Sequence, residues 1–127
     1  MVIHNNKYKY DFKGGNIMKK NITVLGLCAG RHELPVSGYV FGNIVDPTDL
    51  QGMMNTAHES LQDVEALELY VTGLTVACTT VIRYCINNLI PLKLMHFDRE
   101  SGSYYPQVIL GNEEVFALRN EHGITSI

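Results

Sequence analysis

The fold is decided by residues 66–97, ALELYVTGLTVACTTVIRYCINNLIPLKLMHF. This stretch begins and ends with short, mostly apolar runs, residues 66–71 and 92–97, which are typical of strands covered on both faces. Between them, the segment from residue 75 to about residue 88 is apolar on most faces, as a buried helix is, and Pro91 ends it. A strand, a helix and a strand in this order predict a parallel pair joined by a crossover helix.

A second strand and helix precede this unit. Residues 22–27, ITVLGL, predict a buried strand, and residues 36–45 fit either a short hairpin or an irregular excursion. A helix start follows, with Asp46 as the expected N-cap and Pro47 at the first helical position. Apolar residues then recur at helical spacing from residue 50 to residue 64, which predicts an amphipathic helix with one buried stripe.

The end of the chain predicts an antiparallel addition to the sheet. After an expected turn at residues 98–102, residues 104–110 return as a strand, and Pro106 favours an edge position for it. The tail has room for one short helical turn around residues 113–118. The whole pattern predicts a small Rossmann-like α/β domain, with a mainly parallel sheet, crossover helices and a C-terminal antiparallel edge strand.

We expect this single domain to span residues 18–127. Residues 1–17 are polar and contain a Lys-Gly-Gly step, whereas Met18, followed by two lysines and an apolar run, is typical of a natural start. We therefore interpret residues 1–17 as a flexible N-terminal extension or the product of an upstream start codon, outside the fold.

Composition and charge limit the function classes. The chain of 127 residues is 46% hydrophobic and 18% charged, which is too apolar for a disordered protein. Its 10 Lys and Arg against 13 Asp and Glu give a net charge of −3, and no basic cluster extends beyond Lys19 and Lys20, so duplex nucleic acid is not an expected partner. No apolar run reaches the roughly 18 residues of a membrane span.

The cysteines and the missing nucleotide fingerprints limit the chemistry. Cys28, Cys78 and Cys85 include no CxxC pair, and we interpret them as buried thiols in a reducing, cytoplasmic compartment. No clustered ligands predict a metal site. The chain has neither a Walker A loop nor a GxGxxG motif, so we expect neither a nucleoside-triphosphatase nor an NAD enzyme, and no cofactor.

The strand ends carry the main functional signal. Open parallel sheets bind ligands beyond the carboxyl ends of their strands, where the N-termini of the crossover helices also point. The three strand ends of this chain deliver the ligand-binding candidates Gly30, Arg31, His32, Thr72, Gly73, Leu74, Thr75, Asp98 and Arg99.

The turn Thr72-Gly73-Leu74-Thr75 is the most specific element of this set. Its glycine lets the backbone turn sharply or approach a ligand closely. The free N–H groups of the helix that follows favour an anion, for which a phosphate group is the natural choice. The alternative is a plain strand-to-helix turn with Thr75 as the N-cap and nothing bound.

Arg31, His32 and His96 are the candidates for neutralising the charge of a phosphate or for catalysis. Arg31 suits bidentate recognition of a phosphate, although it could equally pair with Glu33 in solvent. His32 could donate a hydrogen bond to a phosphate or act as a general acid or base. His96 is the second catalytic candidate, but it shares a strand face with Leu92, which also fits a hydrogen-bonded core histidine.

Residues 67–97, with this turn between an apolar strand and a buried helix, resemble the CRISPR-associated Rossmann-fold (CARF) sensors over about a quarter of the chain. The resemblance implies binding of a cyclic oligonucleotide over the carboxyl strand ends, typically by a dimer. The family's ligand turn maps onto Thr72, Gly73 and Thr75, and Arg31 and His32 stand where its first-strand loop would be. The chain is shorter than a typical CARF domain and carries no effector, which makes it similar to the sponges or ring nucleases with which phages blunt nucleotide-triggered immunity.

Three functional hypotheses follow. The first is a cytoplasmic homodimer or higher oligomer, in the host cytoplasm if the protein is phage-encoded, that binds a nucleotide-derived signalling molecule without turnover. The second is an enzyme, a phosphodiesterase or ring nuclease, that cleaves this ligand with His32 or His96 as acid or base. The third is a protein-binding scaffold without a small ligand. We expect the first, with no membrane partner.

Overall fold

The computed structural model describes residues 7–13, 16–30, 33–44 and 46–121, with side chains from residue 21 onward. Its elements in chain order are β1 (Lys7–Lys13), β2 (Asn16–Cys28), β3 (Tyr39–Phe41), α1 (Leu50–Leu61), β4 (Ala66–Tyr70), α2 (Thr75–Asn87), β5 (Leu92–Asp98), β6 (Ser103–Leu110) and α3 (Asn112–Glu121). Within these residues the strands form one mixed sheet of order β1-β2-β4-β5-β6, and β3 pairs with β2 off this path.

The centre of the sheet is parallel and both of its ends are antiparallel. β4 pairs in parallel with β2 on one side and with β5 on the other, and β6 returns antiparallel along β5. The structure thus confirms the predicted fold class, a small Rossmann-like α/β domain with a C-terminal antiparallel edge strand. β6 stands at the end of the strand order, as Pro106 predicted.

One edge of β2 is shared by two strands. β1 pairs antiparallel with the first half of β2, from Asn16 to Ile22, whereas β3 pairs in parallel at Gly26 and Cys28. The other edge of β2 carries β4. Because the chain leaves β2 toward β3 on one edge and later reaches β4 on the other, the carboxyl ends of β2 and β4 flank a topological switch point.

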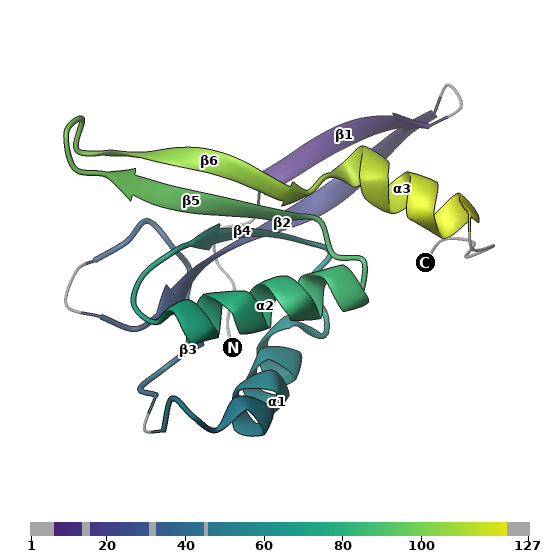
Figure 1. Ribbon diagram of the computed structural model, residues 1–127. Helices are drawn as coiled ribbons and strands as arrows, with labels where there is room; N and C mark the ends of the chain where they lie inside the picture. Colours follow the sequence, from purple (N-terminus) through teal and green to yellow (C-terminus); the bar gives the residue numbers. More distant parts are fainter. Residues whose placement is uncertain (1–6, 14–15, 31–32, 45, 122–127) are drawn as a thin grey trace.

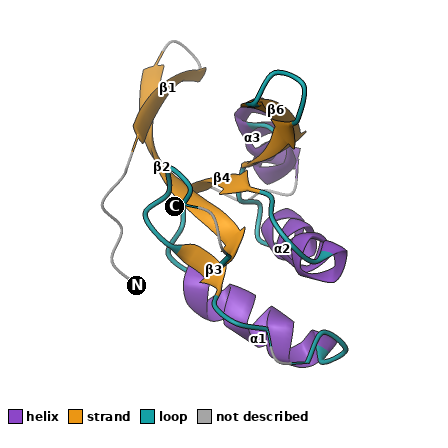
Figure 2. Cartoon of the chain, turned by 90° about the vertical axis from the view of Figure 1, so that its left-hand side faces the viewer, coloured by secondary structure: helices purple, strands orange, loops and turns teal. Residues whose placement is uncertain are grey.

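Both crossover helices cover the same face of the sheet, and they lie side by side in Figure 1 and in Figure 2. Their buried stripes, which include Met53 and Ala57 of α1 and Ala77 and Val81 of α2, pack against leucines of the central strands to form the main core. The opposite face holds a smaller apolar cluster of Ile22, Val24, Ala66 and Tyr70, against which Leu34 and Val36 of the β2–β3 connection pack.

α1 begins later than the sequence predicted. Its N-cap is Asp49, whose carboxylate accepts a hydrogen bond from the backbone N–H of Gly52 at 3.0 Å. Asp46, the predicted N-cap, instead accepts from the backbone N–H and the hydroxyl of Thr48, at 2.9 and 2.6 Å. The prediction was wrong because Asp46 closes a turn of its own before the helix starts, and the second aspartate then caps the helix.

Three further segments differ from the expectations. Residues 7–13, which the sequence left outside the domain, form β1, and residues 113–118, expected as a single turn, lie within the ten-residue helix α3. α3 starts with half of a capping box, in which the Glu114 carboxylate accepts from the backbone N–H of Gly111 at 3.0 Å. Within residues 36–45, β3 runs parallel to β2, so the hairpin alternative was wrong.

Candidate functional site

The carboxyl ends of β2 and β4 meet through Cys28 and Thr72. The Thr72 hydroxyl donates to the carbonyl oxygen of Cys28 at 3.1 Å and accepts from its backbone N–H at 3.4 Å. These bonds join the two chain segments across the switch point. Two of the three expected strand ends therefore converge, but the Thr72 hydroxyl forms its hydrogen bonds with the Cys28 backbone.

Gly73 turns the chain from β4 toward α2. Its φ of +81° lies in the left-handed region, which glycine adopts without steric cost. A Cβ atom at this position would lie 3.6 Å from both Cβ and Sγ of Cys28. The turn therefore packs its backbone directly against the end of β2.

The first turn of α2 lacks a side-chain cap. Leu74, in extended conformation, is the N-cap residue, so the expected N-cap Thr75 is instead the first residue of the helix, and the prediction was wrong by one position. No side chain bonds the cap, and the first turn contains no acidic residue. Gly73, Leu74 and Thr75 are all exposed, so α2 starts at the surface of the molecule.

The Cys28 thiol lies beneath this turn. Burial raises the pKa of Cys28 and outweighs a hydrogen bond from the backbone N–H of Leu74, which lowers it. Burial, and then the charge of Cys28, raise the pKa of Cys78 on α2, and burial raises the pKa of Cys85 to about 12. All three are free cysteines, and such thiols stay protonated at neutral pH, so none is an activated nucleophile.

The loop after β2 is only partly described. Gly30 is exposed, and a Cβ atom at this position would lie 4.0 Å from the carbonyl oxygen of Cys28. Arg31 and His32, the expected phosphate ligands, lie outside the described residues.

His96 lies on β5 and bonds to the neighbouring strand. Its Nε2 is 2.8 Å from Oε1 of Gln107 on β6, and its ring packs against Tyr105 with a centroid distance of 5.4 Å. The side chain is half-buried. Its position on the face of Leu92 and Leu94 agrees with the hydrogen-bonded histidine that the strand alternation also allowed.

Asp98 and Arg99 lie on a projecting hairpin. The ladder between β4 and β5 ends at Tyr70 and Met95, and β5 then continues with β6 alone (Figure 1). Asp98 therefore lies about 10 Å along the strand beyond that ladder, at 3.3 Å per residue. Its carboxylate accepts from the backbone N–H groups of Glu100 and Ser101, and Arg99 is exposed. The third strand end thus extends past the other two instead of closing a compact site with them.

In the described ranges, no group of three or more His, Cys, Asp or Glu side chains could hold a metal ion. No helix in this part of the chain is long and apolar enough to cross a membrane. No protein-family model matches the chain, and no curated protein or solved structure is significantly similar to it.

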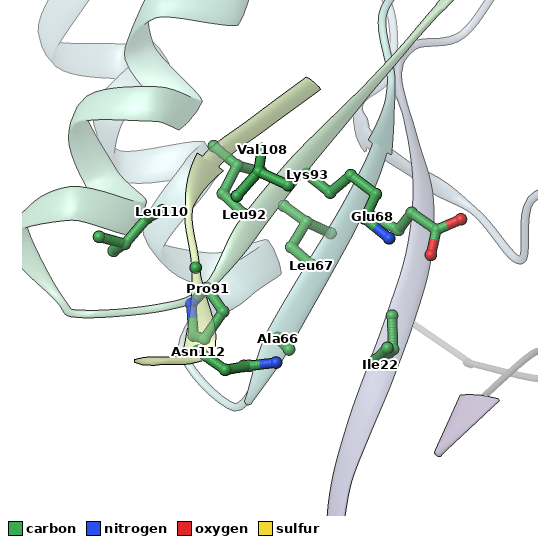
Figure 3. A pocket seen from close by; sticks show the side chains of 11 residues that line it. Ile22, Ala66, Leu67, Glu68, Pro91, Leu92, Lys93, Val108, Leu110 and Asn112 are labelled. Atoms are coloured by element: carbon green, nitrogen blue, oxygen red, sulfur yellow. The ribbon is translucent and has the colours of Figure 1, made fainter. Parts of the chain in front are cut away.

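A cavity of about 210 Å³ lies at the opposite edge of the sheet, at the amino ends of the parallel strands (Figure 3). Its polar side chains are Glu68 of β4, Lys93 of β5 and Asn112 of α3. None of these three residues was among the predicted site residues, which all lie at or beyond the carboxyl ends of the strands. The available signal was Glu68, a carboxylate within the otherwise apolar run of residues 66–71.

Proposed function

We propose that the protein binds a phosphate-containing, nucleotide-derived signalling molecule at the carboxyl ends of β2 and β4, without cleaving it. The observation that carries the proposal is the start of α2, which lies at the switch point with exposed residues from Gly73 to Thr75 and no side-chain cap. A helix N-terminus of this kind, next to a left-handed glycine, is an arrangement that holds phosphate groups in α/β proteins.

The surroundings of the turn favour an anion over a neutral ligand. The dipole of the 13-residue helix α2 places partial positive charge at this end, and no carboxylate in the first turn cancels it. The Thr72 hydroxyl and the Leu74 N–H are already bonded to Cys28. Contacts to a phosphate therefore fall to the backbone of Gly73 and to Thr75, whose hydroxyl adds a further donor.

The nucleotide part of the proposal rests on the resemblance to the CARF sensors. That resemblance gives Arg31 the role of neutralising the phosphate and His32 the role of hydrogen-bond donor. Asp98 and Arg99, on the projecting hairpin, suit the distal part of a ligand larger than one phosphate. In this role the protein sequesters a messenger and counters nucleotide-triggered immunity, and a symmetric messenger suits a two-fold dimer.

The variant Thr75→Asp tests the site. A carboxylate at the start of a helix stabilises the helix but repels an anionic ligand. Gln51→Asp is the matched control, because Gln51 is exposed in the first turn of α1 and the change adds the same charge at the other crossover helix. We expect both variants to keep or slightly raise the melting temperature, and only Thr75→Asp to lose the ligand.

The ligand is measured by binding and release. The protein is mixed with cyclic oligonucleotides, cyclic dinucleotides and ADP-ribose derivatives, desalted and denatured, and the released compounds are weighed by mass spectrometry. A compound returned intact by the wild type and Gln51→Asp, but not by Thr75→Asp, supports the proposal. A cleaved compound replaces it with the enzymatic hypothesis, for which His32→Ala and His96→Ala identify the acid or base. If the protein retains and alters none of these compounds, the result contradicts both the binding and the enzymatic hypotheses. It then favours the hypothesis of a protein-binding scaffold.

A further inference from the structure

The basic residues of the chain are concentrated in one hairpin. Five of the ten Lys and Arg residues fall within residues 7–20, together with only one of the 13 Asp and Glu residues, Asp11. The rest of the chain contains the other five basic residues and twelve acidic ones. The net charge of −3 therefore averages a basic hairpin with an acidic remainder. The lysines of the hairpin are Lys7, Lys9, Lys13, Lys19 and Lys20.

β1 and residues 16–21 of β2 form a two-stranded arm that extends beyond the rest of the sheet. The ladder between β2 and β4 begins at Ile22 and Ala66, so among the described residues this part of β2 pairs with β1 alone. Figure 1 shows the arm running past the ends of β4 and β5. At about 3.3 Å per residue, residues 16–21 make the arm about 20 Å long. All five lysines of the hairpin belong to it.

Strand pairing in the arm brings together lysines that lie apart in the sequence. Only Lys19 and Lys20 are neighbours along the chain. In the arm, Lys9 stands opposite Lys20 in the register of β1 and β2. Like charges at such paired positions repel each other, and a bound anion reduces that repulsion. The pairing thus creates a basic segment that the spacing of the lysines in the sequence does not show.

Aromatic residues alternate with these lysines along β1. Its sequence, KYKYDFK, has Tyr8, Tyr10 and Phe12 at every second position, and such positions belong to one face of a strand. Lys19 stands opposite Tyr10 in the register, so a cation and an aromatic residue share one position of the arm. Proteins that bind single-stranded nucleic acid use these two kinds of residue together. Their cations follow the phosphates, and their aromatic rings stack on the bases.

We infer that the arm binds single-stranded nucleic acid, with the lysines neutralising phosphates and the aromatic residues of β1 stacking on bases. The lysines favour a polyanion, and the aromatic row favours a strand with accessible bases over an acidic protein, which has none. In a duplex the bases stack on one another and are not free to stack on these rings. A duplex also has the higher charge density, which the acidic remainder of the chain repels.

Fluorescence anisotropy of labelled oligothymidylate, titrated with the full chain at several salt concentrations, tests this inference. We expect the wild type to bind it more tightly than an A·T duplex of the same length or poly-L-glutamate. Lys19→Gln should reduce the slope of log affinity against log salt by about 0.7, the contribution of one phosphate contact on a single strand. This change corresponds to about fivefold weaker binding at about 0.1 M salt.

Arg83→Gln is the matched control for Lys19→Gln. Arg83 is exposed on α2, so this variant removes the same charge from the acidic remainder and should change neither the slope nor the affinity. Tyr10→Leu should weaken binding about fivefold or more and leave the salt slope unchanged, because stacking releases no counterions. Its control is Tyr105→Leu, which removes an exposed tyrosine from β6 and should bind as the wild type does.

This site is also separable from the proposed messenger site. Thr75→Asp should bind oligothymidylate as the wild type does, whether or not the protein retains a messenger. The inference is overturned if the wild type does not bind oligothymidylate, or if the duplex or poly-L-glutamate binds as tightly. It is also overturned if Arg83→Gln or Thr75→Asp weakens binding as much as Lys19→Gln. Salt-dependent self-association without oligothymidylate binding, measured by analytical ultracentrifugation, would assign the arm to a second copy of the chain instead.

Discussion

At the carboxyl edge of the parallel strands, polar groups of the chain form hydrogen bonds with one another. At the amino edge, other polar side chains line a cavity. Thr72 satisfies both backbone groups of Cys28, while Asn112 keeps a buried amide oxygen without a partner among the described residues. The first edge offers the uncapped start of a helix, and the second offers charged side chains that line a cavity. A surface turn accepts ligands of many sizes, but a cavity selects by volume.

β3 packs against β2 at the carboxyl edge, and Gly26→Ala should disrupt this contact. A Cβ atom at Gly26 would lie 2.5 Å from Cε1 of Tyr39, so the ring must move. We expect a loss of about 1–3 kcal/mol in the free energy of unfolding, the usual cost of overpacking, measured by urea denaturation. In the Tyr39→Leu background the same change should cost much less, and an equal cost in both backgrounds contradicts the steric explanation.

Thr72→Val tests whether the hydroxyl joins the strand ends. The substitution keeps the shape of the side chain but leaves the Cys28 backbone groups without this partner, so we expect a loss of about 1–2 kcal/mol by denaturant titration. Thr79→Val is the control, because Thr79 is exposed and its hydroxyl bonds only Val76 of its own helix. Equal effects of the two variants would show that Thr72 does not hold the edge together.

At the amino edge, Asn112→Leu should not lower the free energy of unfolding, in contrast to the two variants at the carboxyl edge. Removing a buried acceptor that has no partner relieves its desolvation cost, so stability should stay unchanged or rise by up to about 1 kcal/mol. The measurement is the urea midpoint, with Asn120→Leu, at an exposed position of α3, as the control. A clear loss of stability would mean that this side chain serves the fold and would remove the contrast between the edges.

The smallest expected effect is at the tip of the β5–β6 hairpin. Hydrogen bonds from Ser101, and then from Glu100, hold the pKa of Asp98 below its ordinary value. A lowered pKa contributes stability above the unfolded-state pKa, near 4, that is lost as the pH falls through the folded-state value. Asp98→Asn should therefore lower the melting temperature slightly at pH 7, and the difference should shrink as the pH falls below about 4. A difference that stays the same throughout an acid titration would exclude the charge as its cause.

Periodicity predicted the central fold well, because its signals are local. The apolar runs of β4 and β5, the stripe of α1 and the stop at Pro91 each follow from neighbouring residues. β1 was missed because its polar composition contains no such signal, and its place in the sheet comes from its antiparallel pairing with β2. The start of α1 was misplaced because Asp46 and Asp49 are both able to accept from the residues that follow them.

The candidate site was predictable only as far as topology determines it. The meeting of Cys28 with Thr72 follows from parallel strands that end at one edge. That the Thr72 hydroxyl turns inward depends on side-chain geometry that spacing does not encode. The cavity was missed for a similar reason, since Glu68, Lys93 and Asn112 come together only through strand register and the position of α3.

The division of one β2 edge between β1 and β3 also determines where the molecule opens first. In the described part of the chain, β1 pairs with the first half of β2 and with no other strand. β1 can therefore separate while the rest of the sheet stays paired. β4 has a strand on each side and a helix layer over one face. Amide hydrogens of β1 should therefore exchange with solvent by local fraying, whereas those of β4 exchange only when the whole domain unfolds.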